Sequence, residues 1–371
     1  MDARYRIEDT SQIISPALIV FRDILGENIS QMIQMAGDVS RLRPHCKTHK
    51  MRQVVELQLK RGITKQKCAT FAEAEMLAEA GAKDIMLAYN LVGPNIGRAV
   101  KFVEKYPDVS FSATADHERP IAGLGGAMTA AGCSIDLLLD IDSGQHRTGV
   151  QIGPMAEQLY GKIAETPGLR AGGLHVYDGQ NHQTPIDERT AAVDAVWQRV
   201  RAFRDELAAH DWPVPRIVAG GTGSFPIFAR QDDPTIELSP GTCIFHDVGY
   251  GECFPDLKFT PAALLLTRVV SRPTKDRVTC DLGYKAVASD PPMGRRLVFP
   301  DLPDARQVLQ NEEHLVLEMS HAAQYEPGDE LLAIAWHICP TSALHRQAFV
   351  VSEERLVDRW DVAARDRWLT V

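Results

Sequence analysis

Short apolar runs alternate with longer amphipathic runs between residue 42 and about residue 252. The short runs have the length and turn-forming borders of β-strands, and the longer runs have the spacing of helices. One of the longer runs, FAEAEMLAEAGA, places Ala and Leu on one helix face and has Gly81 where a C-terminal cap is expected. The eight predicted strands are residues 42–49, 67–71, 84–90, 110–116, 134–142, 171–179, 216–221 and 235–242.

Strands that alternate with helices predict right-handed β-α-β units and a parallel sheet. Eight such units within about 200 residues fit a closed (β/α)8 barrel of the TIM type. The fold class is therefore α/β, and a doubly wound open sheet is the structural alternative.

The pattern changes after about residue 253. Five further strand-like runs follow with few helical stretches between them, and Pro, Gly and Asp turns link them. They predict a second, mostly antiparallel β domain. We therefore expect a barrel domain of residues 16–252 and a β domain of residues 253–371 that also contains residues 1–15. The five runs are residues 262–274, 276–283, 314–326, 329–338 and 345–351.

Composition narrows the class of partner. The 371 residues include 49 acidic and 40 basic side chains, a formal charge of −9, which argues against nucleic acid or an anionic membrane and favours a small molecule. The first 21 residues carry charges throughout, and no later run has about 18 unbroken apolar residues, so we expect no signal peptide and no membrane anchor. Seven cysteines without a CxxC pair fit reduced thiols in the cytoplasm.

Polar residues gather where the predicted barrel strands end. In such a barrel the active site is built from the loops at the carboxyl ends of the strands. The first strand ends at Lys47, and Arg147 follows the fifth. The sixth ends in His175, Tyr177 and Asp178, the seventh in GGTGS and the eighth in SPGT.

The stretch AGGTGSFP is a candidate phosphate-binding loop. Gly221 and Gly223 allow a ligand close to the backbone, and Thr222 adds a hydroxyl, so successive N–H groups can surround a phosphate. A tight β-α turn is the alternative, because no GK[ST] follows. Gly241 and Thr242 of SPGT add donors from the neighbouring strand end, and barrel phosphate sites favour the seventh and eighth loops.

Lys47 lies within RLRPHCKTHKM and is either a solvated basic residue, part of a metal site, or a reactive amine. At a strand end inside a barrel, desolvation and the positive charges of Arg43, His45 and His49 would lower its pKa and favour a nucleophilic amine. An amine near a phosphate loop predicts pyridoxal 5'-phosphate as the cofactor.

Two further residues fit this cofactor. Arg147 is placed to hydrogen-bond the cofactor ring or its phenolic oxygen, and Tyr177 to pack against or hydrogen-bond it. The alternative for Arg147 is a salt bridge to Asp140 or Asp142.

The stretch WHICPTSALH suggests a metal site. If it leaves a strand in extended form, His337 and Cys339 point to one face because strand side chains alternate. Imidazole and thiolate are suitable Zn²⁺ ligands, although a buried cysteine near a core histidine is the commoner explanation of such a pair.

Six segments together resemble the metal-activated, pyridoxal-dependent family of D-threonine aldolase and D-serine dehydratase. They are RPHCKTHK, DIDSGQHRTGV, GLHVYDGQNH, GGTGS, SPGT and HICPT, within a resemblance that covers about residues 16 to 350. It implies fold type III, as in alanine racemase, and a homodimer whose active site is shared between subunits. The segment DLGYKAVASD resembles a family segment near the subunit interface.

The resemblance also implies the roles of single residues. It gives Lys47 as the Schiff-base lysine, with Arg147 and Tyr177 near the cofactor. It places Gly221, Thr222, Gly223, Gly241 and Thr242 around the phosphate, and His337 and Cys339 as ligands of a divalent metal such as zinc or manganese. The segment MSHAA departs from the family's glutamate-rich stretch, so His321 is less securely placed.

The features that carry the resemblance point to two different reactions. His-x-Cys is typical of the dehydratases, whereas the tyrosine of VYDG, the PT after the metal motif and the chain length are typical of the aldolases. We expect a lyase that cleaves β-hydroxy-D-amino acids to glycine and an aldehyde, with His45, His49 or a metal-bound hydroxide as the candidate base. The first alternative is a D-serine or 3-hydroxy-D-aspartate dehydratase that gives a 2-keto acid and ammonia and uses Lys47 to remove the α-proton. An amino acid racemase and a non-catalytic pyridoxal carrier are the others.

Overall fold

A computed structural model describes residues 2–371. The chain forms two compact units. One contains the residues up to Gln31 together with Thr48–Arg52 and Thr242–Arg365. The other contains Met32–Lys47, Gln53–Gly241 and Asp366–Val371. We call them the β unit and the barrel unit after their sheets.

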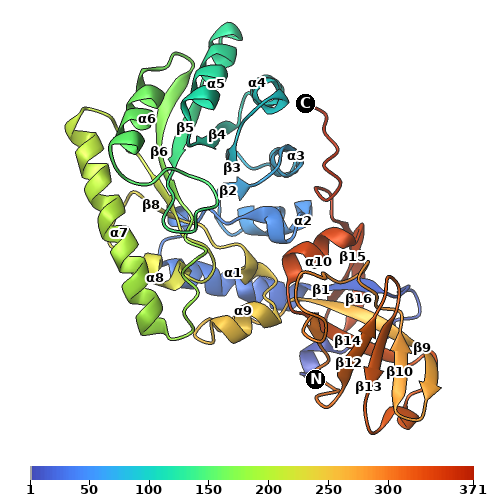
Figure 1. Ribbon diagram of the computed structural model, residues 1–371. Coiled ribbons are helices and arrows are strands. Elements are labelled where there is room, and N and C mark those ends of the chain that lie inside the picture. Colours follow the sequence, from blue (N-terminus) through green and yellow to red (C-terminus); the bar gives the residue numbers. More distant parts are fainter. Residues whose placement is uncertain (1) are drawn as a thin grey trace. The chain divides into compact units, whose positions relative to one another are not determined.

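The barrel unit is built on a seven-stranded sheet in which every strand pairs in parallel with the next one along the chain. Helices α3 to α7 lie along the outside of these strands (Figure 1). The strands are β2 (Lys65–Cys68), β3 (Asp84–Asn90), β4 (Ser110–Ala115), β5 (Ile135–Asp140), β6 (Leu169–Val176), β7 (Ile217–Ala219) and β8 (Ile236–Leu238). The predicted α/β class, a TIM-type barrel followed by antiparallel strands, is confirmed.

The first predicted barrel strand, residues 42–49, is not a continuous strand. It holds a short 3-10 helix, η3 (Cys46–Thr48), after isolated parallel bridges from Leu42 to Leu238 and from His45 to Lys67. The prediction was wrong here because Pro44 has no N–H to donate and interrupts the ladder. The two bridges still join this segment to β8 on one side and β2 on the other. They close the ring of strands.

Alternate strands fill the interior of the barrel. Met86 on β3, Leu138 on β5 and Val218 on β7 form a buried cluster. Layers contributed by alternate strands are the usual filling of such barrels. Paired residues on parallel neighbours face the same side of the sheet. The register therefore identifies which polar residues also point inward.

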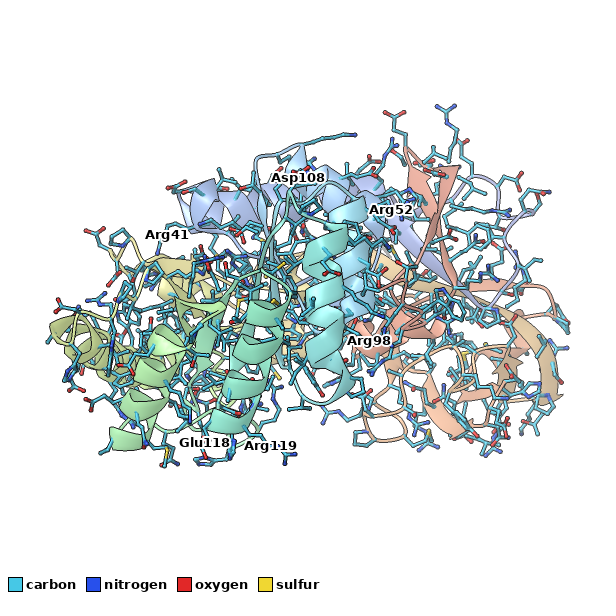
Figure 2. The ribbon with its side chains drawn as sticks, turned by 90° about the horizontal axis from the view of Figure 1, so that it is seen from above. Arg41, Arg52, Arg98, Asp108, Glu118 and Arg119 are labelled. Carbon is cyan, nitrogen blue, oxygen red and sulfur yellow. The ribbon has the colours of Figure 1, made fainter. Side chains whose placement is uncertain are left out.

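The helices of this unit begin and end at recognisable signals. At the start of α3, Thr70 Oγ1 accepts from the N–H of Glu73, and Glu73 Oε2 accepts from the N–H of Ala69, a capping-box arrangement. Gly81 follows the end of α3 with φ of +96°, the conformation that favours glycine. In Figure 2, Glu118 and Arg119 mark the first turn of α5. The helices are α2 (Arg52–Leu59), α3 (Phe71–Glu79), α4 (Pro94–Lys105), α5 (Glu118–Ala130), α6 (Pro154–Glu165), α7 (Ile186–Ala209) and α8 (Phe225–Ala229).

The β unit has one nine-stranded sheet. Its main order is β12-β13-β10-β9-β1-β15-β16, and β14 pairs with both β9 and β11. All pairs are antiparallel except β1 with β15. The strands are β1 (Ala17–Phe21), β9 (Ala263–Thr274), β10 (Arg277–Cys280), β11 (Leu297–Val298), β12 (Arg306–Gln310), β13 (Leu315–Glu318), β14 (Glu330–Ala335), β15 (Gln347–Ser352) and β16 (Arg355–Asp361).

Strand β1 was not among the predicted strands. Its five residues, ALIVF, are all buried, so the run shows no alternation of apolar and polar positions. A short, uniformly apolar run cannot be assigned by periodicity alone. The β unit also contains the helices α9 (Val248–Cys253) and α10 (Ile338–Leu344), and α1 (Arg22–Ala36) follows β1 directly. Among residues 2–371, no helix combines the length and apolar character needed to cross a membrane.

Candidate active site

Three of the predicted cofactor residues meet in the barrel unit. Lys47 lies on η3, and its Nζ is 5.9 Å from the centre of the Tyr177 ring. The guanidinium carbon of Arg147 is 4.8 Å from the centre of the same ring. An amine, a guanidinium and a phenol ring therefore surround one place just beyond the carboxyl ends of the strands. This is the combination that a pyridoxal phosphate site needs.

The two carboxylates considered as salt-bridge partners of Arg147 bind other groups. Asp142 Oδ2 lies 2.6 Å from His146 Nδ1. Asp140 Oδ1 lies 2.7 Å from Nδ1 of His175, its register partner on β6. Burial lowers the pKa of His175, and the His175 pairing holds the pKa of Asp140 below its usual value although burial acts to raise it. Neutral imidazole and charged carboxylate therefore form this pair near neutral pH.

Lys67 is a site residue that sequence reasoning missed. It is 2% exposed and pairs in register with Met86, so its side chain faces the barrel interior. Burial, together with the nearby positive charges of Lys47 and Arg43, lowers its pKa to about 7. The sequence signal that could have identified it is KQKC, in which Lys67 follows another lysine by two residues, the spacing of side chains on one face of a strand.

The glycine-rich loop packs against the ring of Tyr177. A Cβ atom on Gly221 would lie 2.9 Å from Tyr177 Cε2, so only glycine fits there. The Gly221 N–H donates to Ser224 Oγ at 3.1 Å, and that hydroxyl donates to Asp178 Oδ1 at 2.7 Å. These hydrogen bonds therefore hold the loop in place, and the absence of a side chain at Gly221 leaves room for the aromatic ring.

The residues assigned to the phosphate do not all lie together in one unit. The Gly241 N–H donates to Thr222 Oγ1 at 3.1 Å, which joins the seventh and eighth loops within the barrel unit. Thr242 belongs to the β unit, where its hydroxyl lies 3.6 Å from Cys339 Sγ. The N–H groups of Gly221 and Gly241 are thus engaged within the loops, and Gly223 lies between Thr222 and the start of α8.

In the β unit, His337 and Cys339 lie at the start of a helix and not on an extended strand. His337 is the N-cap of α10, and Cys339 lies in its first turn. The strand prediction was wrong because Asp247 Oδ2, from a distant part of the chain, accepts from the N–H of Ile338 at 2.9 Å and helps to start the helix.

The two predicted metal ligands nevertheless meet. Burial alone would lower the pKa of His337, but hydrogen bonds to Cys339 and Asp290 raise it to about 9. Asp290 Oδ2 lies 2.6 Å from His337 Nδ1, which leaves Nε2 as the nitrogen to bind a metal. Thr48 Oγ1 lies 3.2 Å from Cys339 Sγ. Asp290 is the last residue of DLGYKAVASD, and its role could not be read from the sequence spacing.

The donor set fits a divalent metal. Imidazole and thiolate are ligands of zinc-type ions, and a carboxylate on the second ring nitrogen is the usual way to orient such a histidine. Two protein ligands leave positions for water and substrate oxygens. The residues present therefore fit the predicted metal.

The two candidate bases differ in their surroundings. His49 is fully buried, its ring meets that of Phe245 edge-on at 6.3 Å, and burial lowers its pKa to about 3. His45 accepts the N–H of Lys47 at Nδ1 at 3.1 Å and pairs with Lys67 on the barrel seam. His321 is the N-cap of a short 3-10 helix, η5 (Ala322–Gln324), with its ring 6.2 Å from that of Tyr325.

The fold and these residues define an enzyme of the alanine-racemase type. Residues 21–247 match the family described as alanine racemase, N-terminal domain, to which the chain belongs. Residues 262–351 match the family described as putative serine dehydratase domain.

Relatives along the whole chain are lyases. A D-threonine aldolase from an Arthrobacter species is 28% identical and covers 96% of this chain and 93% of its own. A D-threo-3-hydroxyaspartate dehydratase from Delftia sp. is 24% identical over 94% of this chain and 96% of its own. The crystal structure of D-threonine aldolase from Filomicrobium marinum has a TM-score of 0.88, 27% identity and 96% coverage of both chains. The family resemblance and the pyridoxal-dependent lyase class are confirmed.

Proposed function

We propose that this chain is a pyridoxal phosphate- and divalent metal-dependent lyase that cleaves β-hydroxy-D-amino acids to glycine and an aldehyde. The observation that carries this proposal is the His337, Cys339 and Asp290 set. A racemase or a pyridoxal carrier has no need for a metal that binds a β-hydroxyl. Similarity to a D-threonine aldolase over 96% of this chain supports the same reaction.

The barrel unit would hold the cofactor. Lys47 supplies the amine that binds it, Tyr177 offers a ring face, and Arg147 offers donors to its ring or phenolic oxygen. The loop from Gly221 to Gly223 and the Gly241 turn would line the phosphate, with Thr242 beside them in sequence. Bound pyridoxal phosphate supplies an electron sink for the carbanion at Cα.

The β unit would hold the metal through His337 Nε2 and Cys339 Sγ, with zinc or manganese as the ions to test first. A divalent ion there acts as a Lewis acid that lowers the pKa of the substrate hydroxyl. Asp290 fixes the ring of His337, and Thr48 donates to or accepts from the Cys339 sulfur. These residues would thereby hold the ion where the substrate hydroxyl loses its proton.

Our candidate for the base that takes this proton is His45. Its imidazole is held by the N–H of Lys47, the residue that binds the cofactor. His49 lies in an apolar setting against Phe245, where a proton is strongly disfavoured. We therefore assign His49 a structural role.

A dehydratase is the second candidate. Cys339 favours it, because His-x-Cys is the dehydratase-like form of the motif and a relative is a dehydratase. In that reaction Lys47, once the substrate amine has replaced it, would remove the α-proton, and hydroxide would leave with help from the metal.

Product analysis tests both reactions. The holoenzyme with added Mn²⁺ or Zn²⁺ is given D-threonine, D-serine or 3-hydroxy-D-aspartate. Glycine and acetaldehyde from D-threonine establish the aldolase, whereas a 2-keto acid and ammonia establish the dehydratase. Turnover of L-alanine that survives chelation would show a racemase, and no turnover of any substrate would show a carrier.

We also propose a homodimer with a shared active site, located in the cytoplasm. The family resemblance supports the homodimer, and the charge pattern of the chain supports the cytoplasmic location. Light scattering after gel filtration measures the subunit number. Mixing an inactive Lys47→Ala chain with a chain inactivated by a substitution in DLGYKAVASD, the segment expected near the subunit interface, tests sharing, because only shared sites would regain activity.

A further inference from the structure

A second group of metal-binding atoms lies in the barrel unit, apart from His337 and Cys339. One ring nitrogen of His45, the Sγ of Cys46 and one carboxylate oxygen of Glu73 all lie within 4.8 Å of one another. His45 and Cys46 belong to the segment that closes the barrel, and Glu73 lies in the first turn of α3. Two elements far apart in the sequence therefore bring three different donor types together.

The distances suit a tetrahedral ion. Cys46 Sγ is 3.8 Å from Glu73 Oε2. A zinc-type ion with sulfur at about 2.3 Å and oxygen at about 2.0 Å holds these two ligands roughly 3.5 Å apart. The observed separation is close to this value, so an ion fits between them with only a small movement of side chains.

Hydrogen bonds from the backbone orient two of the three ligands. The N–H of Ala69 donates to Glu73 Oε2 at 2.6 Å, and the N–H of Lys47 donates to His45 Nδ1 at 3.1 Å. Such outer hydrogen bonds are what fix ligands at protein metal sites.

Charge and burial favour a soft divalent ion. Cys46 is 1% exposed and Glu73 is 0% exposed. A thiolate and a carboxylate together offset the two positive charges of the ion, which a buried charge requires. The thiolate selects zinc-type ions over magnesium or calcium.

We propose that His45, Cys46 and Glu73 form a second, inhibitory site for a zinc-type divalent ion. Binding releases the thiol proton of Cys46 and occupies the imidazole that we assign as the base, and it fixes the turn that carries Lys47. Excess zinc then inhibits an enzyme that the metal at His337 and Cys339 activates. The inhibitory effect depends on the proposed role of His45, whereas the site itself does not depend on catalysis.

Cobalt is the probe that tests the site, because tetrahedral Co²⁺ bound to thiolate has visible bands to the red of pyridoxal absorption. The dialysed holoenzyme should bind two Co²⁺ per chain, and both Cys46→Ala and Glu73→Gln should bind one. Cys68→Ala, a buried cysteine in the same unit, is the matched control and should bind two. Glu73→Gln keeps a capping-box acceptor, so it separates metal binding from helix capping.

The second site is independent of the first in this experiment. Cys339→Ala should retain one thiolate-bound Co²⁺, and adding Cys46→Ala should remove it. One ion in the wild type that only Cys339→Ala removes would overturn the proposal, as would two ions in Glu73→Gln. These counts need no turnover, so a failed aldolase assignment leaves them unchanged. Circular dichroism checks the fold, and Glu73→Gln carries the test if Cys46→Ala does not fold.

Discussion

At the scale of single residues, the environment of Lys47 explains its suitability for a covalent cofactor. Its amine lies over the face of Tyr177, and Lys67 and Arg147 bring further positive charge into the same barrel. Lys47 does not lie at the end of a regular strand as predicted, because the 3-10 helix η3 carries it.

Lys47→Ala should abolish covalent cofactor binding. The wild type should keep an absorption band at about 410 to 430 nm after dialysis with pyridoxal phosphate, because an imine with Lys47 forms. The variant should lose that band, and Lys60→Ala, an exposed lysine, should keep it. A dialysis-stable band in Lys47→Ala would assign the cofactor to another amine.

Asp290→Ala should weaken binding of the metal at His337. The carboxylate orients the imidazole at 2.6 Å, and loss of such a partner commonly lowers metal affinity by about 10- to 100-fold. Competition with a chromophoric chelator measures the affinity. Glu313→Gln, an exposed member of an ion pair with Lys285, serves as the control. Equal affinities of Asp290→Ala and wild type would remove Asp290 from the metal site.

At the scale of elements, Asp247 joins two helices of the β unit. Its carboxylate accepts from the N–H of Tyr250 in α9 at 2.8 Å and from the N–H of Ile338 in α10 at 2.9 Å. Burial raises its pKa to about 6. The position of Cys339 in the first turn of α10 therefore depends on a residue 92 positions earlier.

Asp247→Ala should lower the free energy of unfolding by about 1 to 3 kcal/mol, because two helix starts lose their acceptor. Asp247→Asn should recover part of this loss. Urea denaturation followed by circular dichroism measures both variants. An unchanged urea midpoint in Asp247→Ala would show that water replaces the carboxylate at both helices.

The alternation of short and long runs was enough to predict the elements of the barrel. Strand β3 has the predicted bounds, and β4 to β8 begin or end within a few residues of theirs. The interruption at Pro44 was missed because the pattern of apolar positions does not register the missing N–H of proline. The helix at Cys339 was missed because its start depends on Asp247, a partner distant in sequence. Local periodicity contains no information on such contacts.

The candidate site was predictable where a motif is continuous in sequence. Lys47, Arg147 and Tyr177 come together as expected. Asp290 and Lys67 were missed, because only the register and the tertiary contacts bring them to the site.

At the scale of the whole molecule, Lys67 couples the stability of the barrel to pH. Its pKa falls from 10.5 to about 7 on folding, so between these values the unfolded chain binds a proton that the native chain lacks. This group therefore makes the free energy of unfolding rise with pH from about 7 to 10.5, by at most about 1.4 kcal/mol per pH unit. Below pH 7 Lys67 is protonated in the native chain as well, so the free-energy cost of burying its charge no longer changes with pH.

Lys67→Met should remove this dependence. We expect the variant to be more stable than wild type at pH 7 and its stability to rise less between pH 7 and 10. Urea unfolding of the cofactor-free protein at several pH values measures the slopes. Lys101→Met, an exposed lysine on α4, should keep the wild-type slope. Parallel slopes for Lys67→Met and wild type would contradict the assignment.

The division of the molecule stays a proposal. We propose the boundaries predicted from the sequence, a barrel domain of 16–252 and a β domain of 253–371 with residues 1–15. Limited proteolysis followed by mass measurement tests them, since cleavage concentrates in exposed linkers.

The closure of the barrel through Pro44 has a kinetic consequence. Three backbone hydrogen bonds hold this closure, from Arg43 N–H to Leu238, from His45 N–H to Pro240 and from Lys67 N–H to Pro44, at 2.8 to 2.9 Å. A seam with so few bonds opens more readily than a full ladder. In the cofactor-free protein, these three amides should exchange with deuterium faster than those of β5, and cofactor bound at Lys47 should slow them. Faster exchange at these amides would show that the seam opens locally before the cofactor is bound.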